Sequence, residues 1–215
     1  MILNTGQRTD IPAFYADWFL RRVREGSVMV RNPFNYQRIT SYRIDPEVVD
    51  VIAFCTKNPA PMLGKLGELA GYRQYWHVTI TPYDKDIEPN VPPAGEVISS
   101  CLEDPGLAKI GIDTSGCMTK EKLEKAFNLK LKIPNIKTHQ ARQGCACLLG
   151  NDIGAYTTCP HLCKYCYANE SPEAVIENRN KHDPHSPLLI GHVEKEDQVV
   201  EARQESWIDR EISLF

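Results

Sequence analysis

The sequence predicts an α/β fold in which βα units form a mostly parallel sheet and a cysteine-rich segment follows towards the C-terminus. Segments typical of strands and helices alternate through residues 1–81, which is the pattern of parallel strands connected by helices. The run VVDVIAFCT at 48–56 is almost continuously apolar, as expected for a strand covered on both faces. The chain has eight cysteines, and five of them lie within residues 145–166. The first half therefore predicts the scaffold, and the cysteine segment predicts the chemistry.

The elements expected in the first half follow from local patterns. Strands are expected at 1–5, 27–33, 36–44, 48–56 and 74–81, and helices at 12–25 and 60–72. The first helix has Asp10 as its expected cap, and Pro12 stands where a missing N–H does little harm. Its apolar face includes Trp18 and Phe19. The breaks between these elements are rich in polar residues, which supports separate βα units.

The second half begins with a change of character at residue 89. PNVPPAGEVISSC, at 89–101, is a proline-rich join into a further expected strand. A short helix is expected within TKEKLEKAFN, with Thr119 as its cap and Asn128 at its exit. After the cysteines, two polar helices are expected over 171–180 and 195–209.

Composition limits the classes of function. The chain has 215 residues, of which 42% are hydrophobic and 25% charged, as in a globular protein with a substantial core. The net charge of −3 and the pI near 6.1 give no sign of nucleic-acid or anionic-membrane binding. No apolar run approaches the length of a membrane span, and the first residues do not have the pattern of a signal peptide. We therefore expect a cytoplasmic protein in a reducing environment.

The stretch CPHLCKYCYAN, at 159–169, carries the most specific motif of the chain. Its three cysteines have the spacing C-x3-C-x2-C. They are Cys159, Cys163 and Cys166. Three thiolates from one short loop suit a [4Fe–4S] cluster, whose fourth iron takes a ligand from the protein or from a substrate. An open fourth iron can bind S-adenosylmethionine, which the reduced cluster would cleave, and Tyr165 would pack on the adenine.

Zinc is the alternative that the cysteines leave open. GCAC supplies Cys145 and Cys147, so that four thiolates could surround one zinc ion. C-x-C is a tight pair for a zinc knuckle, however, which favours iron–sulfur ligation. If Cys145 or Cys147 reached the fourth iron, the cluster would be closed and would serve electron transfer or structure. Disulfides are disfavoured, because five clustered cysteines cannot all pair and the expected compartment is reducing.

The cysteine motif and several other stretches resemble known families. CPHLCKYCYAN looks like the cluster loop of radical SAM enzymes, particularly those of the spore photoproduct lyase-like kind. The chain as a whole resembles the bacterial domain of unknown function family 1848 (DUF1848). The similar stretches are RTDIPAFYADWF, VRNPFN, TKNPAPM, DIEPN, GCAC, DIGAYTTCPHLCKYCYAN and HDPHSPLLIG. The resemblance implies that Cys159, Cys163 and Cys166 are cluster ligands, and it implies no substrate, because the family has none established.

The resemblance also implies the outline of the fold, an incomplete TIM-barrel-like parallel sheet. Family members are longer, and several βα units are missing here between NVPPAG and EVISSC. The chain is expected to form one domain, with a partial barrel of βα units at 1–93 and a C-terminal part at 94–215. That C-terminal part holds the cysteine cluster at 144–169 and the tail helices. Missing strands would leave sheet edges exposed, which self-association could cover.

A substrate pocket is expected at the carboxyl ends of the strands, where parallel α/β sheets bind their ligands. The candidates are Arg8, Asp10, Lys57 and Asn58. The equally open alternative is that these are solvated loop residues. The histidines His182, His185 and His192 are expected at the surface rather than on a metal, and SPLLIG is expected to anchor the tail to the core.

The leading hypothesis from the sequence is therefore an iron–sulfur enzyme of radical SAM type. It would act with an electron donor on an unidentified small-molecule or macromolecular substrate. The alternative is a non-enzymatic module that binds zinc or a closed iron–sulfur cluster, as a truncated family member would.

Overall fold

The computed structural model divides the chain into two compact units. Unit 1 comprises Met1–Val78 and Asn151–Ser206, and unit 2 comprises Thr79–Gly150 and Trp207–Phe215. The structure describes residues 1–4, 13–56, 69, 71–78, 109, 114–116, 118–139, 147–148, 150–160, 162 and 168–210. The expected organisation into parts 1–93 and 94–215 stays a prediction.

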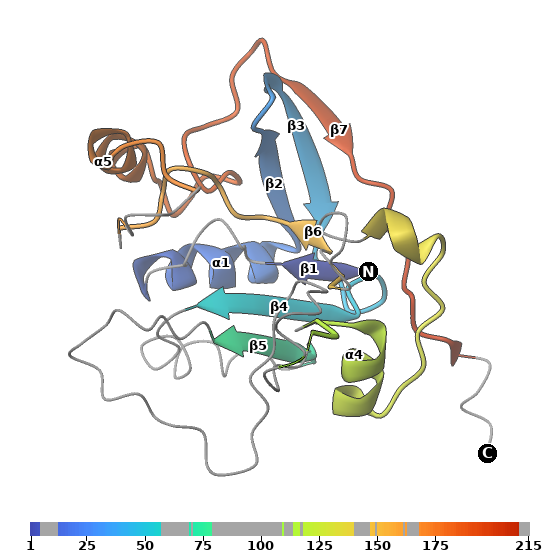
Figure 1. The fold of residues 1–215 in the computed structure, drawn as a ribbon. Coiled ribbons are helices and arrows are strands. Elements are labelled where there is room, and N and C mark those ends of the chain that lie inside the picture. The colour runs from blue at the N-terminus through green and yellow to red at the C-terminus, as the bar shows by residue number, and fades with distance from the viewer. Residues whose placement is uncertain are drawn as a thin grey trace. The chain divides into compact units, whose positions relative to one another are not determined.

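Sheet A of unit 1 is a parallel sheet with the strand order β5-β4-β1-β6 (Figure 1). Its strands are β1 (Ile2–Asn4), β4 (Val51–Thr56), β5 (Gln74–Val78) and β6 (Asn151–Asp152). Leu3 stands opposite Ile52 on one side and Asn151 on the other, and every pairing in the sheet is parallel. The carboxyl ends of all four strands therefore lie at one edge. The predicted α/β class and parallel sheet are confirmed, while its TIM-barrel-like form stays a prediction.

Helix α1 (Ala13–Glu25) covers sheet A with the apolar face that the sequence predicts. Trp18 and Phe19 are both buried. The ring of Phe19 meets that of Phe54 in β4 edge-on, with centroids 5.9 Å apart, a favourable geometry for two aromatic rings. Gly26 follows the helix with a φ of 74°, a left-handed conformation that suits glycine at a helix end.

Sheet B of unit 1 contains the hairpin of β2 (Ser27–Asn32) and β3 (Asn35–Arg43). The side-chain oxygen of Asn32 accepts hydrogen bonds from the backbone N–H groups of Phe34 and Asn35, at 2.8 and 3.1 Å, which closes the turn. Both strands were predicted, but they pair antiparallel in a sheet separate from sheet A. A tight turn permits this pairing, whereas a parallel pair needs a long crossover.

The prediction of a helix over 195–209 is wrong. Residues Gln198–Glu201 form strand β7, which pairs in parallel with β3 and gives sheet B the order β2-β3-β7. The two neighbouring valines, Val199 and Val200, suit a strand, and the hydrogen bonds to β3 decide the outcome. The polar residues around them have a pattern that is also typical of a helix, and the sequence does not show that β3 is their partner.

The two helices expected around the cysteines are confirmed, together with the predicted cap Thr119 and exit Asn128 of the first. In α4 (Lys120–Phe127), in unit 2, the hydroxyl of Thr119 accepts from the N–H of Lys122 at 3.2 Å, and Asn128 ends the helix in the left-handed conformation. In α5 (Pro172–Asn180), in unit 1, the hydroxyl of Ser171 accepts from the N–H of Ala174 at 3.1 Å. Unit 2 also contains the short 3-10 helix η1 (Ile136–His139).

The segment after α5 anchors to the core, as the sequence predicts for SPLLIG. Leu188 and Leu189 are buried, and the indole nitrogen of Trp18 donates a hydrogen bond to the carbonyl oxygen of Ser186 at 2.8 Å. His185 and His192 are exposed, whereas His182 is half-buried and its Nδ1 lies 2.8 Å from the carbonyl oxygen of Leu189.

Replacing Trp18 by phenylalanine is expected to lower the free energy of unfolding by about 1–3 kcal/mol, the usual effect of leaving a buried polar group without its partner. Trp18 is fully buried, and the carbonyl of Ser186 would lose its indole donor. Urea unfolding followed by circular dichroism measures the change. Tyr36→Phe is the control, because Tyr36 is 72% exposed and its replacement should change stability little. Equal stability of Trp18→Phe and the native chain would contradict the anchoring role.

Within the described part of the chain, no helix has the length and apolar character needed to cross a membrane.

Candidate functional site

The chain leaves strand β6 at the carboxyl edge of sheet A, directly beside β1. The N–H of Ile153 donates to the carbonyl oxygen of Asn4 at 2.8 Å, which continues the contact between the two strands by one residue. The N–H of Gly154 then donates to the carboxylate of Asp152 at 2.7 Å and turns the chain away from the sheet. The cysteine loop, residues 159–169, begins five residues later. It therefore follows a strand that neighbours β1 at the edge where parallel sheets bind ligands.

Hydrogen bonds close the base of the cysteine loop. The N–H of Thr157 donates to the carbonyl oxygen of Ala168 at 2.7 Å. The side-chain amide of Asn169 donates to the carbonyl oxygen of Cys159 at 2.8 Å. From α5, the side-chain amide of Asn178 donates to the carbonyl oxygen of Thr157 at 3.1 Å. Both ends of the loop are thus held together, and α5 holds them from outside.

Two residues of this region have backbone conformations that side chains other than glycine rarely adopt. Thr157 has a φ of 57° and Leu162 a φ of 48°. The left-handed region is unusual for a β-branched residue such as Thr157, and the three hydrogen bonds to its N–H, hydroxyl and carbonyl groups compensate for the strain. Leu162 lies between the first two cysteines of the motif and is 45% exposed. Left-handed residues within such loops turn successive backbone N–H groups into a concave anion site, a feature of many iron–sulfur loops.

The structure describes two of the five clustered cysteines. Cys159 and Cys147 are both buried, and neither is in a disulfide. In unit 2, a Cβ atom added at Gly116 would lie 3.2 Å from the sulfur of Cys147, so the backbone approaches this cysteine closely where φ is 97°. Among the described residues, no group of three or more histidine, cysteine, aspartate or glutamate side chains could hold a metal ion.

The other predicted site residues lie outside the described residues. They are Arg8, Asp10, Lys57, Asn58, Cys145, Cys163, Tyr165 and Cys166. Their assignment as ligands, cofactor contact and pocket residues stays a prediction. The strands that precede Arg8 and Lys57, β1 and β4, do end side by side at the carboxyl edge of sheet A.

A buried side-chain oxygen at the loop base has no hydrogen-bond partner among the described residues. Oδ1 of Asn169 is shielded from solvent and accepts no hydrogen bond from them, while the amide nitrogen of the same side chain donates to the carbonyl oxygen of Cys159. Such an acceptor is unfavourable unless a donor from a bound molecule satisfies it. The side chain of Asn169 therefore offers an unused acceptor, Oδ1, beside its bonded donor, the amide nitrogen.

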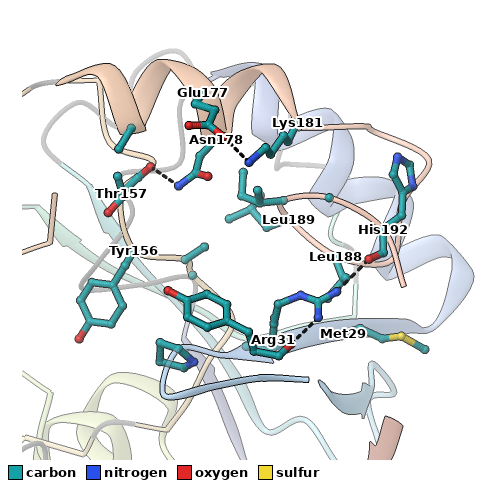
Figure 2. Close-up of a pocket in the computed structure, with 18 of the residues that line it drawn as sticks. Met29, Arg31, Tyr156, Thr157, Glu177, Asn178, Lys181, Leu188, Leu189 and His192 are labelled. Atoms are coloured by element: carbon teal, nitrogen blue, oxygen red, sulfur yellow. Dashed lines mark hydrogen bonds and ion pairs between the residues drawn. The ribbon is translucent and has the colours of Figure 1, made fainter. Parts of the chain in front are cut away.

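A cleft of 440 Å³ lies against the base of the cysteine loop. It is lined by β2, the turn after it and Tyr36 of β3, by residues 153–157, by Glu170, by α5 and Lys181 after it, and by residues 188–192 and Glu194, and this set of residues is called the α5 cleft. Figure 2 shows Asn178 of α5 and Lys181, directly after the helix, on one side of the opening and Arg31 of β2 on the opposite side. Thr157 belongs both to the cleft wall and to the base of the cysteine loop. Sequence reasoning missed the cleft, although VRNPFN and HDPHSPLLIG, two of the stretches on which the resemblance rests, both contribute to it.

Arg31 holds one wall of the cleft in place. Its guanidinium donates to both carboxylate oxygens of Asp197, at 2.5 and 2.8 Å, to the carbonyl oxygen of His192 at 2.9 Å, and to the carbonyl oxygen of Tyr36. The hydrogen bond to Asp197 raises the pKa of Arg31. The same hydrogen bond, with one from the N–H of Glu194, holds the pKa of Asp197 below its usual value. This pairing of two planar groups joins β2 to the segment before β7.

Acid is expected to weaken this wall of the cleft. Because the pKa of Asp197 is lowered in the folded chain, the unfolded chain binds more protons in acid, and the stabilisation is lost as the pH falls from above 3.8 through the lowered pKa. The unfolding free energy of Asp197→Asn should therefore depend less on pH in this range than that of the native chain. Urea unfolding at pH values from about 5 to 3 tests this. Glu177→Gln is the control, since the exposed pair of Glu177 with Lys181 should contribute little, and an equal effect of both variants would contradict the assignment.

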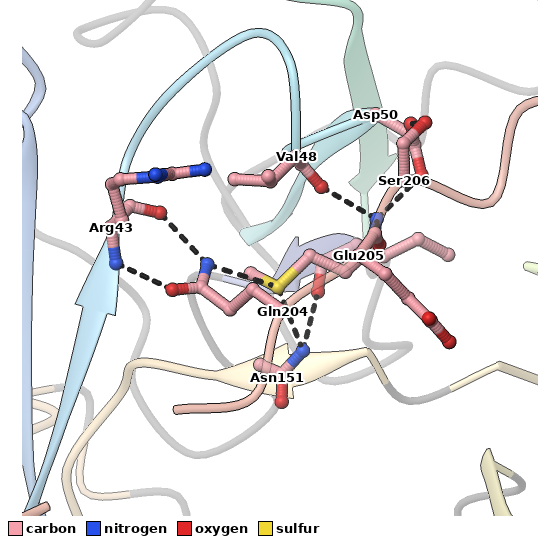
Figure 3. A network of polar contacts seen from close by, with 9 residues as sticks. Arg43, Val48, Asp50, Asn151, Gln204, Glu205 and Ser206 are labelled. Carbon is pink, nitrogen blue, oxygen red and sulfur yellow. Dashed lines mark hydrogen bonds and ion pairs between the residues drawn. The ribbon is translucent and has the colours of Figure 1, made fainter. Parts of the chain in front are cut away.

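A polar network fixes the amino end of β1 (Figure 3). The α-amino group of Met1 donates to the carboxylate of Asp50 at 2.5 Å and to the carbonyl oxygens of Val48 and Glu205, each at 2.7 Å. Ser206 donates its hydroxyl hydrogen to the other oxygen of Asp50 at 2.5 Å. Burial lowers the pKa of the α-amino group, and the hydrogen bond and charge of Asp50 act in the opposite direction. The network ties β1 to the segments before β4 and after β7.

Gln204 continues sheet B beyond the last residue of β7. Its side-chain amide accepts from the N–H of Arg43 at 2.7 Å and donates to the carbonyl oxygen of Arg43 at 2.8 Å (Figure 3). The side chain thereby replaces a peptide group beside β3.

Comparison with known proteins gives one match. A family model described as Domain of unknown function (DUF1848) matches residues 2–100 and 95–168. The two matched segments meet at residues 95–100, within the region where the sequence suggests that βα units are missing. No curated protein and no solved structure matches the chain.

Proposed function

Because this chain belongs to the DUF1848 family, whose name assigns no activity, we propose its function from its own residues: it is an iron–sulfur protein of radical SAM type. Cys159, Cys163 and Cys166 would hold a [4Fe–4S] cluster and leave the fourth iron for S-adenosylmethionine. The observation that carries the proposal is the closed base of the cysteine loop at the carboxyl edge of sheet A.

The place of the loop in the sheet supports the proposal. Radical SAM enzymes carry their cysteine loop after the first strand, whereas this loop begins at residue 159. Strand β6 compensates for the difference, because it lies directly beside β1 and points in the same direction. The cysteine loop thus emerges next to the position that a loop after β1 would have. This arrangement corresponds to a permuted site on an incomplete TIM-barrel-like sheet.

The described residues of the loop fit such a cluster. Cys159 is buried at the base of the loop, where its carbonyl oxygen accepts a hydrogen bond from the side-chain amide of Asn169. The left-handed conformation of Leu162 suits a loop that wraps an anionic group. The unsatisfied Oδ1 of Asn169 suits a bound molecule that brings an N–H donor, as the ammonium group of S-adenosylmethionine does.

The roles of the remaining residues follow from these positions. When bound and reduced, the cluster supplies the electron for cleavage of S-adenosylmethionine. Tyr165 would pack on the adenine, and Asn169 would orient the methionine end through its acceptor. Arg8, Asp10, Lys57 and Asn58 follow β1 and β4 in the sequence and would bind the substrate at the carboxyl edge. The reaction further needs an electron donor and fits a reducing cytoplasm.

A module that binds zinc or a closed cluster is the second candidate. Cys147, one of its candidate ligands, is buried in unit 2, where a Cβ atom added at Gly116 would lie 3.2 Å from its sulfur. A fourth thiolate from Cys145 or Cys147 would saturate the metal. A family match in two segments that meet at residues 95–100 also suits a truncated member.

Metal analysis separates the two candidates. The chain is purified without oxygen, and iron, acid-labile sulfide and zinc are measured. The proposal predicts brown protein with iron and sulfide in near-equal amounts, and colourless, zinc-loaded protein would refute it. Addition of S-adenosylmethionine to the reduced protein then tests whether the fourth iron is open. A changed EPR signal and release of deoxyadenosine are expected, and an unchanged signal without deoxyadenosine would leave the closed cluster.

A further inference from the structure

The α5 cleft has the size and floor of a small-molecule site. Its volume of 440 Å³ falls within the range of about 300–1,000 Å³ usual for such sites. Leu188 and Leu189 contribute buried apolar side chains, with 1% and 4% exposure. Tyr36, near the start of β3, is 72% exposed although it is a large aromatic residue, and Ile190 is half-buried. A ligand with an apolar body would cover part of both side chains.

The two cationic side chains that line the cleft, Arg31 and Lys181, already form ion pairs with carboxylates. The guanidinium of Arg31 makes four hydrogen bonds, two of them to Asp197. The ammonium group of Lys181 lies 2.6 Å from the carboxylate of Glu177. An anionic ligand such as a phosphate ester would have to displace one of these partners. The cleft is therefore unsuited to anions.

Two further carboxylates give the cleft an excess of negative charge. Glu170 and Glu194 line it, both are exposed, and neither forms an ion pair within the residues that the structure describes. Glu194 lies close enough to Arg31 for its charge to contribute to the raised pKa of the guanidinium. The pair of Arg31 with Asp197 and that of Lys181 with Glu177 are each neutral, so Glu170 and Glu194 have no further cation to match them among the described residues that line the cleft. Clefts lined by one sign of charge concentrate ligands of the opposite sign.

The C-terminal end of α5 and two tyrosines also favour a positively charged ligand. Asn178, in the last turn of α5, and Lys181, directly after the helix, line the cleft, and the C-terminal end of a helix carries a partial negative charge. Tyr36 and Tyr156 also line the cleft, and tyrosine faces attract ammonium groups. Each of these contributions is small, and they agree in sign with the excess carboxylates.

We propose that the α5 cleft binds a small organic diamine, a molecule in which an apolar chain joins two ammonium groups. The apolar chain lies against Tyr36 and Ile190, and the ammonium groups pair with Glu170 and Glu194. No cysteine among the residues that the structure describes lines this site, so its binding is proposed to be independent of iron. It touches the base of the cysteine loop through Thr157 and Glu170, so a bound diamine would lie next to the proposed cluster.

Titration calorimetry of the full chain with 1,5-diaminopentane tests the proposal, with glutarate, a dicarboxylate of the same length, as the opposite probe. Saturable binding of the diamine and none of glutarate are expected. The double variant Glu170→Gln with Glu194→Gln should weaken diamine binding at least about tenfold, which corresponds to the loss of about 1.4 kcal/mol. Glu173→Gln with Glu196→Gln is the matched control, because both residues are exposed and lie outside the cleft.

Three results would overturn the proposal. They are equal binding of glutarate, equal weakening by the control pair, and no saturable heat with the diamine. The same titration on Cys163→Ala separates the cleft from the cluster. Binding that persists in that iron-depleted variant supports the cleft whatever the metal is, and binding that vanishes there assigns the diamine to the cluster and overturns the cleft.

Discussion

Cys163→Ala is expected to lose most of the bound iron when it is purified without oxygen. The proposed cluster depends on three thiolates from one loop, and removal of one leaves two, too few to hold the cubane. The brown colour and the sulfide content should fall together with the iron. Iron and sulfide assays on protein of equal folded content, checked by circular dichroism, measure the effect.

Cys55→Val is the matched control for this prediction. Cys55 belongs to strand β4, where a cysteine of similar size to valine is expected to act as a small buried hydrophobic residue. This variant should keep its iron. If Cys163→Ala retained iron at the level of Cys55→Val, Cys163 would leave the ligand set and the radical SAM proposal would lose its motif.

Asp50→Ala is expected to lower the free energy of unfolding by about 3–5 kcal/mol, the usual effect of removing one partner from a buried ion pair. Asp50 is 1% exposed, and its carboxylate holds both the α-amino group of Met1 and the hydroxyl of Ser206. The loss should be larger at pH 6 than at pH 9. The pKa of the α-amino group is already lowered by burial, and in the variant nothing from Asp50 raises it again. Deprotonation at higher pH then removes the unpaired charge, so stability rises with pH.

Urea unfolding at both pH values measures this effect. Glu47→Ala is the control, because Glu47 is an exposed carboxylate three residues away in sequence and should change stability little. A loss of similar size in both variants, or a larger loss for Asp50→Ala at pH 9, would show that the buried pair is not what holds β1.

The elements that the sequence could predict are those set by neighbours along the chain. The spacing of Trp18 and Phe19 defines α1, and the hydroxyls of Thr119 and Ser171 cap helices within three residues. Strand β6 has no such signal, since its two residues, Asn151 and Asp152, are not typical of strands and pair only because β1 is there. Strand β7 was wrongly predicted as helix for the same reason, because its partner β3 is distant in the sequence.

The features of the candidate site also separate into those set by neighbours along the chain and those set by distant residues. The cysteine spacing is readable from the sequence, because a short loop brings its own ligands together. The closure of that loop by α5 is not, because the contact of Asn178 with Thr157 joins residues 21 positions apart. The cleft was missed altogether, since its wall depends on Arg31 and Asp197, which are 166 positions apart and carry no motif. Distant pairs of this kind are decided by the packing of the whole unit.

The double role of Thr157 has a thermodynamic consequence. Its backbone closes the cysteine loop, and its side chain lines the α5 cleft. A molecule in the cleft that favours the conformation of Thr157 in which the cysteine loop is closed would therefore raise the affinity of the loop for metal by some factor. Reciprocity then requires that metal in the loop strengthen occupancy of the cleft by the same factor. The two binding events would be cooperative in either order, even though they share only one threonine and its neighbours.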